Sequence, residues 1–188
     1  MHSYNQIQSF PKYSEIIFLS KIISFFSVLY ILGDDNINNV SQLFKSKEVN
    51  PYGVYCISLC NDGELVDLII DDYIPFDNKK NMECFSKGNE GTVWVQLLEK
   101  AFAKLYGSYY NLERVELDNI FDNITCAPIL TYNSKHKDAP KIMDEIYRYN
   151  WTMFASSGET ASSRDLLKDI GLFCSYFYPI EKVLNYKC

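Results

Sequence analysis

Histidine is scarce in this chain of 188 residues, and the catalytic motifs that depend on it are missing. The two histidines are His2, near the N-terminus, and His136, in the charged stretch NSKHKD that predicts a solvated surface loop. There is no HExxH motif, no glycine-rich phosphate loop and no GxSxG motif. A thiol or hydroxyl nucleophile needs a base beside it. From its residues alone, the chain is poorly equipped for catalysis.

Positive charge and long apolar runs are also limited. The chain has 18 Lys and Arg against 24 Asp and Glu, a net charge of -6, which repels phosphate backbones and excludes nucleic acid as an expected partner. The run FLSKIISFFSVLYIL at 18–32 could be a signal peptide, a membrane anchor or a buried helix. Lys21 interrupts it, and a spanning helix needs ~20 apolar residues. A cap at Ser14 and the stop GDDN at 33–36 favour a buried helix over 14–32 and no membrane span.

No cysteine pair has the CxxC spacing of a zinc site. Six cysteines stand at positions 56, 60, 84, 126, 174 and 188, and no histidine lies near the closest two. A chain of this size does not need disulfides for folding. The pattern predicts reduced, partly buried thiols and a cytoplasmic protein.

The clearest structure that the sequence predicts is a hairpin followed by a helix. NPYGVYCISLC predicts a turn and a strand, Asp62-Gly63 a tight turn, and LVDLIIDD a return strand covered on much of both faces. After a loop over 76–91, VWVQLLEKAFAKLYGSYY carries apolar residues at helical spacing and a stop at Gly107. A short helix is expected over 40–44.

The rest of the chain alternates between strands and helices. CAPILTY predicts a strand, DAPKIMDEIYRYN a helix from about Pro140, and WTMFASSG a strand. ASSRDLLKDIG predicts a short helix, and LFCSYFYPIEKVLN begins another strand. The fold class is therefore α+β.

The segments GELVDLIIDDYIPF and EGTVWVQLLEKAFAKLYGSY together resemble the protease core of the calpain family. WTMFASSGE and GLFCSYFYPIEKV are similar, more weakly, to the segment entering that family's second subdomain. The resemblance implies a papain-like fold: a helical first subdomain with a β-hairpin at 1–125, and the start of an incomplete, β-rich second subdomain at 126–188. It places the active site in the cleft between them. The residues that carry the stronger match are Asp71, Asp72, Pro75, Trp94, Leu97 to Ala101, Lys104, Leu105, Gly107 and Tyr109.

The resemblance also implies where the family's catalytic groups would stand. Aligning IISFFSVL with the family's nucleophile helix puts Ser20 at the cysteine position, and the oxyanion glutamine falls at Ser14. The histidine position becomes Tyr176, and the asparagine would lie beyond Cys188. A serine hydroxyl depends on an adjacent base, and a phenol that titrates near ~10 cannot serve near neutral pH. We expect no peptidase activity.

The calcium position of the first subdomain is altered as well. The glutamate that the resemblance implies shortly after Gly-x-Tyr is Tyr110 here, although Glu113 lies three residues on. Hard cations take carboxylate oxygens, which tyrosine lacks. We therefore expect no cofactor, and an interaction or regulatory module with a protein or peptide partner.

Two alternatives stay open at this point. The first is an active intracellular calcium-dependent cysteine endopeptidase, which would need another thiol such as Cys174, two residues from Tyr176. The second is a fragment of a longer protein, whose second subdomain stops near its first strand and leaves an unpaired edge.

Overall fold

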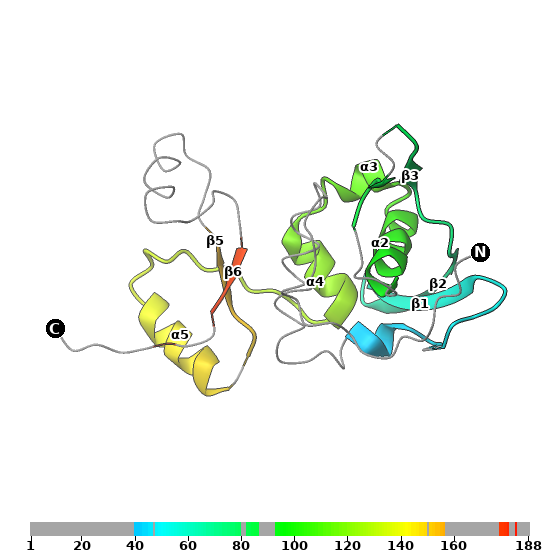
Figure 1. Cartoon of the computed structure of the whole chain (residues 1–188). Coiled ribbons are helices and arrows are strands. Elements are labelled where there is room, and N and C mark those ends of the chain that lie inside the picture. Colours follow the sequence, from blue (N-terminus) through cyan, green and yellow to red (C-terminus); the bar gives the residue numbers. More distant parts are fainter. Residues whose placement is uncertain are drawn as a thin grey trace. The chain divides into compact units, whose positions relative to one another are not determined.

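The computed structural model describes residues 40–46, 48–79, 82–86, 93–149, 151–156, 177–180 and 183. The chain divides into two compact units, Met1–Pro128 and Ile129–Cys188 (Figure 1). The described residues are a mixture of helices and small two-stranded antiparallel sheets, which confirms an α+β chain. The expected helix over 14–32 lies outside the described residues.

A long β-hairpin organises the first unit. Strand β1 (Val54–Asn61) pairs antiparallel with β2 (Glu64–Asp71) through the tight turn at Asp62-Gly63, as predicted. Both turn residues have positive φ, which a glycine adopts without strain. At the open end, Gly53 has φ +66, a left-handed conformation that favours glycine, and a Cβ there would lie 2.6 Å from Asp72 Oδ1.

The two faces of the hairpin differ, contrary to the expectation that β2 is covered on both. Tyr55, Ile57 and Leu59 of β1 and Leu68 and Ile70 of β2 form the buried inner face. On the outer face, Leu65 is 70% and Ile69 60% exposed. The prediction failed because a nearly continuous apolar run shows only that both faces of a strand are apolar, and a packed neighbour decides whether both are buried.

Helix α2 (Trp94–Leu105) covers the inner face of the hairpin, packing on both β1 and β2. Its apolar stripe is buried as predicted, and Gly107, at φ +84, follows the end of the helix. The buried stripe consists of Trp94, Leu97, Leu98, Ala101 and Phe102. A short turn after α2 leads into α3 (Tyr109–Leu112). The side chain of Ser108 caps the N-terminus of α3 by accepting a hydrogen bond from the Asn111 N–H.

Helix α4 (Leu117–Thr125) packs against β1 and was not predicted from the sequence. It buries Leu117, Ile120 and Ile124 and ends at Cys126, which has a left-handed conformation at φ +53. The strand predicted over 126–132 is wrong, because no residue of that segment is in a strand. Cys126 terminates a helix there, and Pro128 lacks the N–H that a ladder needs.

Short elements complete the described first unit. Residues 40–43 are helical, close to the predicted 40–44, and Phe44 forms an isolated bridge with Ile57 of β1. Within the expected loop over 76–91, β3 (Phe76–Asp77) pairs with β4 (Met82–Glu83).

The second unit contains α5 (Ala139–Arg148), which begins next to Pro140 as predicted, and the small sheet of β5 (Phe154–Ser156) and β6 (Phe177–Pro179). The helix predicted over 161–171 lies outside the described residues. Across the described part of the chain, no helix is both long and apolar enough to cross a membrane. The apolar run at 18–32 is not among those residues.

Candidate functional site

The positions at which the resemblance places catalysis are not described by the structure. Ser14, Ser20 and Tyr176 all fall outside the described residues, as does the alternative thiol Cys174. Their roles, and the loss of catalysis inferred from them, therefore stay predictions. What the structure does describe is the scaffold formed by the hairpin and α2, together with Tyr110.

Tyr110 lies on α3, and the positively charged side chain of Arg114 lies against it. The side chain is 60% exposed, and Arg114 Nη2 donates a hydrogen bond to its hydroxyl. The same guanidinium lies 4.4 Å from the centre of the Tyr110 ring, a cation–π contact. Glu113, the residue named as a substitute ligand, caps the C-terminal end of the same helix. No group of three or more metal-ligating His, Cys, Asp or Glu side chains occurs in the described segments.

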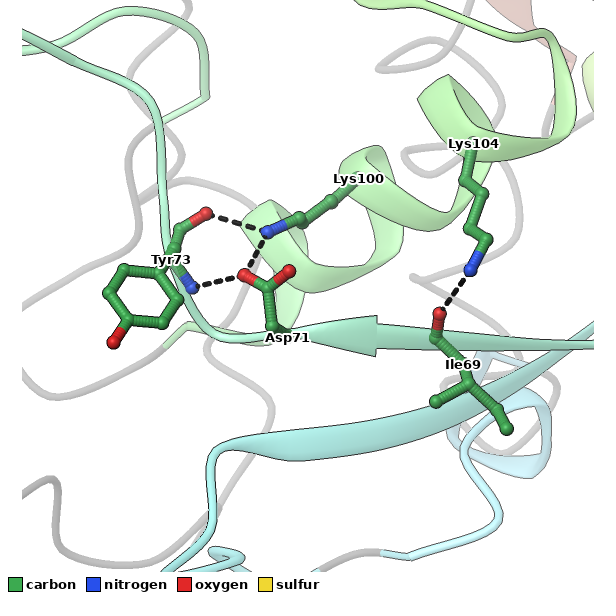
Figure 2. A network of polar contacts seen from close by, with 5 residues as sticks. All are labelled: Ile69, Asp71, Tyr73, Lys100 and Lys104. Atoms are coloured by element: carbon green, nitrogen blue, oxygen red, sulfur yellow. Dashed lines mark hydrogen bonds and ion pairs between the residues drawn. The ribbon is translucent and has the colours of Figure 1, made fainter.

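Two lysines of α2 hold the end of β2 (Figure 2). Lys100 Nζ contacts Asp71 Oδ1 and donates to the Tyr73 carbonyl at 2.7 Å. Asp71 Oδ1 also accepts from the Tyr73 N–H at 2.9 Å. One turn further along α2, Lys104 Nζ donates to the Ile69 carbonyl at 2.6 Å. Asp71, the first residue of the family motif's acidic pair, thus joins the hairpin to the helix, whereas the Asp72 N–H donates to the Gly53 carbonyl within the hairpin.

The charge of Lys100 acts on the carboxyl group that it contacts. Its hydrogen bond, followed by that of the Tyr73 N–H, lowers the pKa of Asp71 below its usual value. Both stabilise the ionised carboxylate. Asp71 is therefore ionised near neutral pH and cannot serve as a proton donor there.

Glu99, which precedes Lys100 on α2, has a buried carboxylate. Glu99 is 1% exposed and accepts from both the N–H and the hydroxyl of Ser86, at 3.1 and 2.5 Å. Phe85 stacks on Tyr109 at 4.2 Å between ring centroids. Burial, with the negative charges of Glu99 and Asp71, raises the pKa of the Tyr109 phenol. These contacts fix the segment after β4 onto α2 and α3, and they leave Tyr109 neutral.

Two cysteines form a disulfide, which corrects the prediction of reduced thiols throughout the chain. Cys60 of β1 is bonded to Cys126 at the end of α4, across a sequence separation of 66. The spacing of the cysteines could not reveal this, because the pair is brought together by the packing of α4 on β1. Cys56 and Cys84 are free thiols among the described residues.

A buried amide stands beside the disulfide and was not singled out in the sequence. Asn123 of α4 is 5% exposed, its Nδ2 donates to the Cys60 carbonyl at 2.6 Å, and its Oδ1 accepts from the Tyr106 hydroxyl at 2.5 Å. Burial, and then the Asp122 charge, raise the pKa of the Tyr106 phenol. Asn123 therefore joins β1, α2 and α4 through neutral hydrogen bonds.

The second unit contributes no constellation of reactive groups among its described residues. His136 is exposed in the predicted surface loop, where its Nδ1 accepts from the Asp138 N–H at 3.3 Å. A hollow on the surface of α5 is lined by Lys141, Asp144, Glu145, Arg148 and Tyr149, and the Arg148–Asp144 ion pair spans one turn of that helix. Such i,i+4 pairs are ordinary surface stabilisation.

A family model described as calpain family cysteine protease matches residues 28–188. The chain is 34% identical over 89 residues to the calpain-type cysteine protease DEK1 of Zea mays, covering 47% of this chain and 4% of that protein. It is 40% identical over 62 residues to calpain-7 of Sus scrofa, covering 33% of this chain and 8% of that protein.

The chain therefore spans less than a tenth of the length of these curated relatives. The match to the family model, however, includes most of the chain, and it contains the hairpin, α2 and the lysine contacts of Figure 2. On this extent of similarity, the chain belongs to the calpain family of cysteine proteases.

Proposed function

We propose that this chain is a non-catalytic calpain-family core that binds a protein or peptide instead of cleaving it. In this proposal the two units correspond to the papain-like subdomains, and neither proteolysis nor calcium binding is retained. The observation that carries it is the residue at the family's nucleophile position, Ser20, where a thiol is required. A serine cannot replace the thiol when the base position holds Tyr176.

The extent of the family match supports this proposal. The matched residues begin at position 28 and so exclude Ser14 and Ser20. The matched residues include the hairpin and α2, so the proposal rests on a family scaffold that is present, while the assignment of Ser20 rests on the alignment of IISFFSVL with the family's nucleophile helix.

The surroundings of Tyr110 support the loss of calcium binding. Calcium takes six to eight oxygen ligands, with carboxylates supplying the negative charge. At this position a phenol replaces the carboxylate, and the Arg114 guanidinium lies against it. A fixed positive charge repels a divalent cation and further weakens any contribution from Glu113.

Incubation of the purified chain with a casein-type substrate, with and without calcium, tests the proposal. We expect no calcium-dependent cleavage. When labelling by a thiol-directed probe is mapped to individual positions, Cys56 and Cys84 should each be labelled to the same extent with and without calcium, and the matched C56S/C84S variant should lose labelling at these two positions only. Calcium-dependent cleavage that Cys174→Ser abolishes would establish the alternative, an active cysteine endopeptidase. Cleavage that Ser20→Ala abolishes would contradict the proposal by showing that Ser20 acts as a nucleophile.

We also propose a cytoplasmic location, on the basis of the family resemblance. The Cys60–Cys126 disulfide weighs against it, since cytosolic thiols are kept reduced. Trapping thiols with an alkylating agent at the moment of cell lysis decides the matter: a protected pair at these two positions in cells contradicts the cytoplasmic assignment.

A further inference from the structure

The free edge of β2 carries backbone groups that an added strand of a partner protein could pair with. Residues of an antiparallel ladder turn their N–H and C=O groups alternately to the paired strand and to the opposite edge. The Ile69 carbonyl accepts from Lys104, so Ile69 points to the free edge, and the register places Asp67 and Leu65 there with it. Within the described residues, no acceptor meets the N–H of Leu65, Asp67 or Ile69.

The side chains of the same three residues form an exposed row on the outer face of the hairpin. Leu65 is 70% and Ile69 60% exposed, and the Asp67 carboxyl between them is 57% exposed. Asp67 Oδ1 accepts from the Ser58 hydroxyl at 2.5 Å and lies 3.7 Å from Lys45 Nζ. An exposed ion pair at that distance contributes little, so the carboxylate can pair with another cation.

We propose that β2 binds an extended segment of another protein by strand addition, with an apolar, a basic and an apolar residue at alternate positions. Strand addition supplies hydrogen-bond partners to the unpaired edge groups. The apolar residues lie opposite Leu65 and Ile69, and the basic one lies opposite Asp67, because directly opposed side chains of like polarity or opposite charge stabilise a sheet. This inference rests on the proposed binding function and gives it a location.

A second copy of the chain fits the same edge poorly. Symmetric antiparallel pairing of two β2 strands about Asp67 sets the two Asp67 carboxylates against each other, and like charges directly opposed are destabilising. The net charge of -6 on each chain adds to the repulsion. The charge pattern therefore favours a basic partner over self-association.

Lys104 regulates access to this edge. Its ammonium occupies the Ile69 carbonyl, at the place where the N–H of an added strand would donate. Edge lysines are a common protection against unwanted strand pairing. An incoming segment must displace Lys104, so only a segment that also matches the side-chain row on the outer face binds well.

Fluorescence anisotropy with a labelled, capped peptide containing Val-Thr-Lys-Thr-Val tests the proposal on the full chain. Replacing the central Lys by Glu should weaken binding about fivefold, corresponding to about 1 kcal/mol for one cross-strand charge pair. Asp67→Lys should reverse this preference, and the Glu peptide should then bind more tightly than the Lys peptide. Asp118→Lys, an equal charge change at an exposed position of α4, should leave the preference as it is.

Two further measurements separate strand addition from contact with an apolar patch. Methylating the peptide nitrogens on the pairing side should abolish binding, and Lys104→Ala should strengthen binding about threefold because it frees the Ile69 carbonyl. Binding that survives nitrogen methylation, or a preference unchanged by Asp67→Lys, overturns the proposal. Concentration-dependent dimerisation through β2 also overturns it. If the peptide does not bind and the casein assay shows no proteolysis, β2 is not the binding surface, but the proposal that the chain is non-catalytic still stands.

Discussion

The two edges of the hairpin are covered to different extents. Along β1, the exposed-edge carbonyls of Val54, Cys56 and Cys60 accept from the Asn50 amide, the Lys45 N–H and the buried Asn123 amide, and Cys60 is also disulfide-bonded. Along β2, the Ile69 carbonyl is met by one lysine. An edge that is held by a backbone N–H, a buried amide and a disulfide belongs to the fold, whereas an edge that is covered only by a flexible charged side chain can be opened.

Among the changes at the two edges, loss of the Cys60–Cys126 disulfide at the β1 edge should lower the free energy of unfolding most. For a separation of 66 residues, loop-closure entropy predicts a loss of about 4 kcal/mol in the free energy of unfolding when Cys60 and Cys126 are both replaced by alanine. Urea unfolding with and without a dithiol reductant measures this in the unaltered chain. Cys56→Ser, on the same strand, is the control and should leave the midpoint within the error of the measurement. Equal urea midpoints for the oxidised and the reduced chain would show that the disulfide does not stabilise the β1 edge.

Asn123→Ala should have the next largest effect, because it leaves the Cys60 carbonyl and the Tyr106 hydroxyl without partners in a buried site. Unsatisfied buried groups cost about 1–3 kcal/mol each, and the Tyr106 hydroxyl is only partly buried, so we expect a total loss of about 2–4 kcal/mol by denaturant unfolding. Asn119→Ala on the exposed side of α4 is the matched control. A loss as small as that of the control would mean that the amide does not close this edge.

Lys104→Met should cost less than about 1 kcal/mol, because its contact with the Ile69 carbonyl is made by an exposed, flexible side chain. The same unfolding measurement applies, with Lys79→Met as a control on an exposed loop. The comparison between the edges would fail if Lys104→Met destabilised the chain as much as Asn123→Ala.

The smallest effect concerns the pH dependence at the end of β2. Because Lys100 lowers the pKa of Asp71 in the folded chain, the pair contributes stability above the unfolded pKa of about 4, and this contribution disappears as the pH falls through the lowered folded value. Asp71 is exposed, so the change should be slight. Following the carboxyl of Asp71 by NMR, we expect Lys100→Met to raise its pKa towards the usual value, while Lys104→Met leaves it nearly unchanged. Equal effects of the two variants would contradict the geometry of Figure 2.

Much of the first unit could be predicted because its signals are local. Asp62-Gly63 specifies a hairpin turn, and the spacing of Trp94, Leu98 and Phe102 specifies a helix with one buried stripe. Pro140 marks the start of α5 in the same way. In each case, neighbouring residues determine the backbone geometry before any tertiary contact forms.

The failures share a different cause. The segment from Cys126 carries strand-forming residues, yet its first residue ends α4 in a left-handed turn. Leu65 and Ile69 have the pattern of a buried strand face, yet no described helix covers them. The candidate site was predictable only as far as the family resemblance reached, which includes Tyr110 but could not reveal that Arg114 lies against it.

By itself the sequence determined the order of hairpin and helix, the charge of the chain and its membership of a family whose scaffold it shares. The tertiary structure decided which cysteines are joined, which face of β2 meets solvent and which edge of the hairpin a lysine covers. The physical reason is range: turns and helices arise from residues close together in the chain, whereas the Cys60–Cys126 bond and the Lys104–Ile69 contact join residues that only packing brings together.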